Sequence, residues 1–129
     1  MTFHFNQDPK TKDCGYRCLY YILNPKYSYE ELLDKLKWLE PVKKGISFSN
    51  IVTILEHHGR ECKFTIPSNK GLYLMWSGVW SKGHYFIYHD GIILDSLAEK
   101  PYPMSLEELI SKVESKSTRD TFYCLKIVV

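Results

Sequence analysis

One cysteine in this chain stands where its thiol could act as a nucleophile. Cys14 begins an uninterrupted apolar segment, residues 14–23, which we expect to form a buried helix that stops at Asn24-Pro25. The N-terminus of a helix carries unpaired N–H groups and a partial positive charge, and this field favours the nucleophilic thiolate. Cys14 is therefore the predicted nucleophile, and Gly15 leaves room for a close approach to its sulfur.

A thiolate nucleophile needs a base whose ring is held by a third group, and a hairpin in the second half of the chain supplies both. His84 begins an aromatic strand, Asp95 lies on the next strand, and Asp90-Gly91 between them is a strong two-residue turn signal. This turn pairs Phe86 with Asp95, which makes His84 the diagonal neighbour of Asp95 on one face of the sheet. We expect Asp95 to orient the His84 ring, and His84 to serve as the base.

Other polar and thiol groups are weaker candidates for a catalytic or metal-binding role. Gln7 precedes the predicted helix, and its amide could donate a hydrogen bond to a developing oxyanion, whereas Asp13 is expected to cap the helix. A structural zinc site is the rival use of the cysteines, but their spacing lacks the two short pairs typical of such a site. Core packing is the expected role of the other three cysteines, which are Cys18, Cys62 and Cys124.

The elements that must position these groups follow from local signals. Ser28 and Glu31, and likewise Ser105 and Glu108, form capping boxes that start helices. Helices are expected over 14–23, about 29–40, about 49–58 and about 106–114. Strands are expected over 62–66, 72–76, 84–89, 92–96 and 121–129. The pattern predicts one α+β domain over 1–129, with N-terminal helices packed against a C-terminal antiparallel β-sheet.

The site residues, taken in order, resemble a known family. Gln7, then Asp13-Cys14-Gly15, then the His84 strand and Leu94-Asp95-Ser96 are similar to the bacteriocin-processing (double-glycine leader) peptidases of the papain-like cysteine peptidase superfamily. The resemblance implies a papain-like fold with Cys14 as nucleophile, His84 as general base and acid, Asp95 as orienter and Gln7 as oxyanion donor. The His84 strand and the Leu-Asp-Ser ending also resemble deubiquitinating Josephin domains, so a leader peptide or a protein conjugate could be the substrate.

Composition excludes several other functions. The net charge is only +2 and the lysines are scattered, which is not the basic stripe of a nucleic-acid binder. No apolar run approaches the roughly 20 residues of a membrane span, and the N-terminus is unlike a signal peptide, so we expect a cytoplasmic protein with reduced thiols. Neither a cofactor nor a metal is expected.

A cysteine peptidase or isopeptidase that acts on a protein or peptide is the leading hypothesis. The alternatives are an acyl-transfer enzyme, such as a transglutaminase-like amidase, and a non-catalytic protein that binds a partner on the same fold. Trp76 and Trp80, which precede His84 in the chain, could line a substrate groove or pack in the core.

Overall fold

The architecture joins a few short helices to one antiparallel sheet. The computed structural model describes residues 14–24, 26–36, 46–77, 84–95, 100–113 and 122–128. Within these residues the chain forms four helices and a six-stranded sheet, and every strand pair is antiparallel. The expected α+β class with an antiparallel sheet is therefore confirmed.

The helices begin where the sequence signals place them. Reciprocal bonds between Ser28 and Glu31 form the expected capping box, with 3.1 Å from Ser28 N to Glu31 Oε1 and 3.2 Å from Glu31 N to Ser28 Oγ. The third helix begins slightly earlier than expected, because the Ser47 hydroxyl caps it by accepting from Asn50 N. The second helix was expected to reach about residue 40, but residues 37–45 lie outside the described part. The observed bounds are α1 Cys14–Leu23, α2 Tyr29–Leu36, α3 Phe48–His57 and α4 Leu106–Val113.

The expected strands form close to their predicted positions, with small differences at their ends and one additional strand. The alternation of Cys62, Phe64 and Ile66 predicted a strand to residue 66, but the strand ends at Phe64, after which Thr65 N still donates to the Cys124 carbonyl of the final strand at 3.1 Å. The strand before Asp95 ends at Leu94, and the short strand at Tyr102 was not expected, because two residues carry no periodic pattern. The observed bounds are β1 Glu61–Phe64, β2 Leu72–Ser77, β3 His84–His89, β4 Ile92–Leu94, β5 Tyr102–Pro103 and β6 Phe122–Val128.

The sheet has the order β1-β6-β2-β3-β4-β5, so the C-terminal strand lies between the first two. The hairpin that carries the candidate base has the expected register, with His89 opposite Ile92 and Ile87 opposite Leu94. Both of its turn residues have positive φ, 50° at Asp90 and 82° at Gly91, as a two-residue hairpin turn requires.

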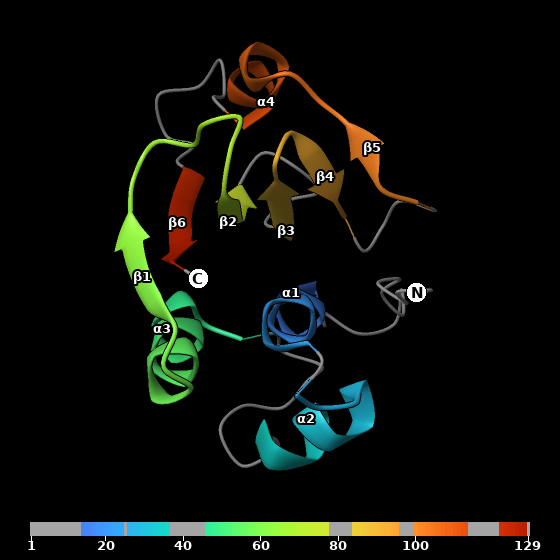
Figure 1. The fold of residues 1–129 in the computed structure, drawn as a ribbon, viewed down its shortest axis with the longest axis vertical. Coiled ribbons are helices and arrows are strands. Elements are labelled where there is room, and N and C mark those ends of the chain that lie inside the picture. The colour runs from blue at the N-terminus through green and yellow to red at the C-terminus, as the bar shows by residue number, and fades with distance from the viewer. Residues whose placement is uncertain are drawn as a thin grey trace.

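Two apolar clusters cover the two faces of the sheet, because successive strand residues point to opposite sides. On one face Leu74 and Ile87 pack with Leu19 of α1, and α2 and α3 complete this cluster. On the other face Met75 and Phe86 pack with Leu109 of α4. Figure 1 shows α1 across the middle of the sheet and α4 on the opposite side. Among the described residues, no helix has the length and apolar character that crossing a membrane requires.

Candidate active site

The first residue of α1 is Cys14, and its side chain is almost covered, at 8% exposure. The residue lies at the end of the helix where N–H groups lack partners within the helix and where the helix dipole is positive. The first turn of α1 contains no acidic residue that would offset this field. The structure therefore places Cys14 at the start of a helix, as the sequence predicted.

The hairpin delivers an imidazole and a carboxylate to the same place. His84 Nε2 lies 2.5 Å from Asp95 Oδ1, in a hydrogen bond between two buried side chains. The exposures are 2% for His84 and 7% for Asp95. A short, buried hydrogen bond between a ring N–H and a carboxylate holds the ring in one orientation.

Cys14 and His84 meet although they lie far apart in the sequence. Cys14 lies close enough to the His84 ring to raise the pKa of His84 through hydrogen bonding and charge, as Asp95 does. Since Nε2 is taken by Asp95, Nδ1 is the ring nitrogen that remains for the sulfur. The structure thus brings Cys14, His84 and Asp95 together at one site.

The charge on the ring follows from its neighbours. Burial lowers the pKa of His84, but the hydrogen bonds and negative charges of Asp95 and Cys14 raise it more strongly. The net result is a pKa of about 9, against an ordinary value of 6.5. The imidazole is therefore protonated near neutral pH, and a positive charge faces the sulfur of Cys14.

At position 15 only glycine fits without a shift of its neighbours, because the side chains of Ile46 and Tyr85 pack against the start of α1. A Cβ atom at this position would lie 2.5 Å from Ile46 Cγ2 and 3.2 Å from Tyr85 Cδ2. The Tyr85 hydroxyl in turn donates to the Ile46 carbonyl at 3.0 Å. The space at Gly15 was expected to admit a close approach to the sulfur, and in this structure Ile46 and Tyr85 occupy it.

The remaining cysteines have different surroundings. Cys18 and Cys124 are buried as expected. Cys62 is only half-buried, and it lies on the edge strand β1, which has a neighbouring strand on one side only. Burial raises the pKa of all three thiols, to about 12 for Cys124, and for Cys18 the negative charges of Cys14 and Asp95 add to the effect. At neutral pH these thiols stay protonated and are weak nucleophiles.

Other predicted site residues fall outside the described part of the chain. Gln7, Asp13 and Trp80 all lie there, so the oxyanion and capping roles expected of the first two stay predictions. Trp76 is described and is partly buried against the core that contains α1. In the described ranges, no group of three or more His, Cys, Asp or Glu side chains could hold a metal ion.

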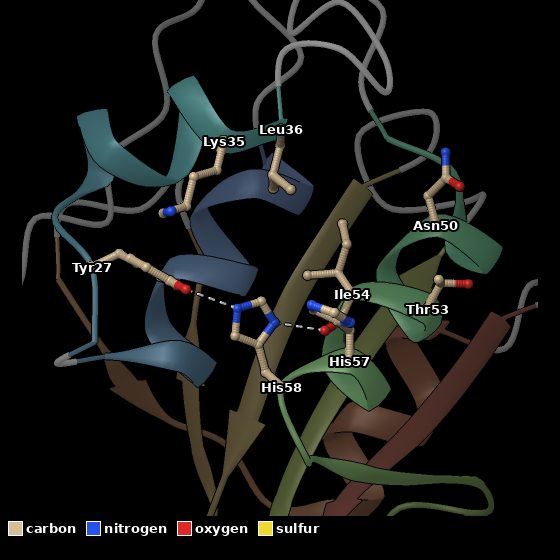
Figure 2. Close-up of a pocket in the computed structure, with 8 residues that line it drawn as sticks. All are labelled: Tyr27, Lys35, Leu36, Asn50, Thr53, Ile54, His57 and His58. Atoms are coloured by element: carbon tan, nitrogen blue, oxygen red, sulfur yellow. Dashed lines mark hydrogen bonds between the residues drawn. The ribbon is translucent and has the colours of Figure 1, made fainter.

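A cavity of about 430 Å³ between α2 and α3 is separate from this site. Figure 2 shows His58 beside it, with Nδ1 at 2.8 Å from the Ile54 carbonyl and Nε2 at 3.1 Å from the Tyr27 hydroxyl. A carbonyl only accepts, so Nδ1 carries the proton and both ring nitrogens are satisfied within the protein. The described residues that line the cavity are Tyr27, Lys35, Leu36, Asn50, Thr53, Ile54, His57 and His58. Cys14, His84 and Asp95 are not among them.

Sequence reasoning did not single out Ile46 and Tyr85 as neighbours of the nucleophile. Tyr85 directly follows His84, and alternation along the strand predicts that its ring points to the opposite side from that of His84. Ile46 lies in a loop, where no periodic pattern indicates its direction. The chain matches no family model, and no curated protein matches it.

Proposed function

We propose that this chain is a cysteine peptidase of papain-like design, with Cys14 as nucleophile, His84 as general base and acid, and Asp95 as orienter. One observation carries the proposal: a buried imidazole is hydrogen-bonded to a buried carboxylate and lies close enough to a helix-terminal thiol for that thiol to raise its pKa. Burying an ionisable group costs free energy unless the group is paired. A thiol, an imidazole and a carboxylate that are buried together are therefore typical of a catalytic site.

In the proposed reaction the Cys14 thiolate attacks the carbonyl carbon of the scissile amide. The C–N bond then breaks, and the proton on His84 Nδ1 passes to the leaving amine, so that a thioester to Cys14 and a free amine result. A water molecule next gives its proton to Nδ1 and attacks the thioester carbon. The acid product leaves and the thiolate is restored.

The negative oxygen that forms during each attack needs hydrogen-bond donors. We expect N–H groups at the start of α1 to serve as donors, since the first turn of a helix leaves them without partners within the helix. We expect the Gln7 amide to add a second donor. On this basis Gln7→Ala lowers kcat on the order of 10²-fold, which is the usual cost of one lost oxyanion donor.

The test is turnover of a peptide library by the full chain, with product masses measured in the presence and absence of a primary amine. Hydrolysis products that need Cys14 support a peptidase, and amine adducts in their place indicate an acyl-transfer enzyme. Cys14→Ala should abolish turnover, and His84→Ala should come close to the same loss.

Cys124→Ala is the matched control, since it removes a buried thiol from the opposite face of the sheet. Full activity in Cys14→Ala would reject the mechanism. Failure of Cys14 in the wild type to react with any peptide or peptide electrophile would leave the non-catalytic binding protein as the better explanation.

A further inference from the structure

The strand β1 lies at one end of the sheet, and among the described strands only β6 is its neighbour. Figure 1 shows β1 at the left margin of the sheet, with α1 across the middle. An edge strand presents backbone N–H and C=O groups that its own sheet does not pair, so it can bind a further strand. The residues of β1 indicate which strand that is.

The pairing with β6 shows which backbone groups of β1 face the open edge. Thr65, directly after β1, donates its N–H to the Cys124 carbonyl at 3.1 Å, one step beyond the paired residues of the two strands. Hydrogen-bonded and non-hydrogen-bonded pairs alternate along an antiparallel ladder. The second and fourth residues before Thr65 therefore bond to β6, and the N–H and C=O groups of Cys62 and Phe64 point to the open edge.

Two opposite charges lie on one face of β1. Glu61 and Lys63 are two residues apart in the strand, so their side chains share a face of the sheet. Their side chains are 66% and 67% exposed, and Lys63 Nζ lies 4.0 Å from Glu61 Oε1. On β6, Glu61 is opposite Val128 and Lys63 is opposite Lys126. The positions directly opposite on β6 therefore offer neither side chain an opposite charge, and the open edge is the side from which one can come.

A second copy of β1 supplies that charge. In a twofold symmetric antiparallel pairing centred on Cys62, each Glu61 lies directly opposite Lys63 of the other copy, and symmetry makes this pair occur twice. The backbone permits this register, because Cys62 faces outward and two copies can exchange N–H···O bonds there. Glu61 and Lys63 then form non-hydrogen-bonded pairs, in which opposite side chains approach most closely.

Charge favours this register over the neighbouring ones that the backbone also permits. A pairing centred on Lys63 would set the two Lys63 side chains opposite each other, and like charges at such positions are destabilising. A pairing centred on Phe64 would set Lys63 opposite Thr65, with no charge pair. Charged residues on an edge strand also discourage pairing with an unrelated apolar strand. The charges of β1 therefore oppose other strands and suit a copy of β1 itself.

Phe64 adds apolar contact to the same register. It is 65% exposed, on the other face of β1 from Lys63. With the pairing centred on Cys62, Phe64 lies opposite Arg60 of the second copy. The Phe64 N–H can donate to the Arg60 carbonyl there, and the Arg60 side chain can cover the exposed ring in a cation–π contact.

We propose that this protein forms a symmetric homodimer, in which β1 pairs antiparallel with β1 of a second copy and Cys62 lies at the twofold axis. The two sheets then join into one continuous sheet. Because each copy contributes a single short strand, we expect weak association, with a Kd on the order of 10⁻⁵ to 10⁻⁴ M. The inference does not depend on the proposed peptidase function, since β6 and β2 separate β1 from the strand that carries His84.

The test is analytical ultracentrifugation of the full chain in reducing buffer, at concentrations up to about 1 mM. The wild type should dimerise. Glu61→Lys and Lys63→Glu each set like charges opposite each other twice, so each should weaken dimerisation at least tenfold. An equal mixture of the two variants should associate as the wild type does, because a mixed dimer again sets a lysine opposite a glutamate at both pairs.

Glu107→Lys and Lys70→Glu are the matched controls, since they make the same charge changes at exposed residues outside β1. Both should dimerise as the wild type does. A wild type that stays monomeric up to about 1 mM would overturn the inference. Dimerisation that survives both β1 variants, or a mixture that fails to associate, would place the contact elsewhere and overturn it as well.

Amide hydrogen exchange followed by NMR tests the backbone pairing itself. The N–H groups of Cys62 and Phe64 should exchange several-fold more slowly at high than at low protein concentration, because the second copy then bonds them. The N–H of Lys63 already bonds to β6 and should change little. Exchange at Cys62 and Phe64 that does not depend on concentration would overturn the inference even if the protein dimerises.

Discussion

Asp95→Asn is the sharpest test of the charge arrangement in the candidate site. The carboxylate of Asp95 is buried and its charge is one of the causes that raise the pKa of His84. An Asn side chain has nearly the same shape and can still accept a hydrogen bond, but it carries no charge. Burial, which lowers the pKa of His84, should then dominate, and the pKa should fall back toward or below its ordinary 6.5.

The magnitude follows from the size of the shift. A rise in pKa from 6.5 to about 9 corresponds to about 3 kcal/mol in favour of the protonated ring in the folded state. Because the folded-state pKa is above the unfolded one, this stabilisation is fully present below pH 6.5 and is lost as the pH rises through 9. The free energy of unfolding of the wild type should therefore fall by up to about 3 kcal/mol across that window.

The assay is urea denaturation at intervals from pH 6 to pH 9.5, with NMR titration of the His84 ring. Asp95→Asn should be less stable than the wild type at pH 6.5, and its stability should change much less up to pH 9. Asp90→Asn is the control, since it makes the same change in the turn of the same hairpin. Its side chain is exposed, and Asn tolerates the positive φ at that position. Parallel curves for Asp95→Asn and the wild type would refute the reasoning.

Three further predictions follow from single contacts. Near neutral pH, iodoacetamide should modify Cys14 much faster than the other three thiols, because Cys14 alone faces a protonated imidazole. Peptide mapping measures the four rates, and equal rates would contradict this prediction. Gly15→Ala should cost about 1–3 kcal/mol, since the new methyl group meets Ile46 Cγ2 at 2.5 Å, and an unchanged urea midpoint would show that Ile46 moves freely. Tyr88→Phe should cost about 1 kcal/mol in urea denaturation, because its buried hydroxyl donates to the Met104 carbonyl at 2.9 Å, and a wild-type midpoint would count against that bond.

Local signals predicted the elements well, because each acts over a few residues. The capping box at Ser105 forms as expected, with Glu108 N at 3.2 Å from Ser105 Oγ. The positive φ values at Asp90 and Gly91 are those that their residue types favour. Such contacts depend little on the rest of the chain, so sequence reasoning can reach them.

Pairings between distant segments could not be predicted in the same way. The two-residue strand β5 exists only because β4 pairs with it, and the sequence at Tyr102-Pro103 has no pattern of its own. The insertion of β6 between β1 and β2 depends on which sheet edges the whole chain leaves available. The strand β1 ends at Phe64 although the alternation continues to Ile66 and the partner strand β6 extends to Phe122.

The candidate site shows the same division. The sequence by itself determined that His84 and Asp95 lie on one face of a hairpin, because a two-residue turn leaves only one register. Only the tertiary structure decided that Cys14 lies beside His84, and that Ile46 and Tyr85 pack against Gly15. Those contacts arise when α1 and α3 pack on the sheet, and helix packing follows the shape of whole apolar faces, which no short stretch of sequence contains.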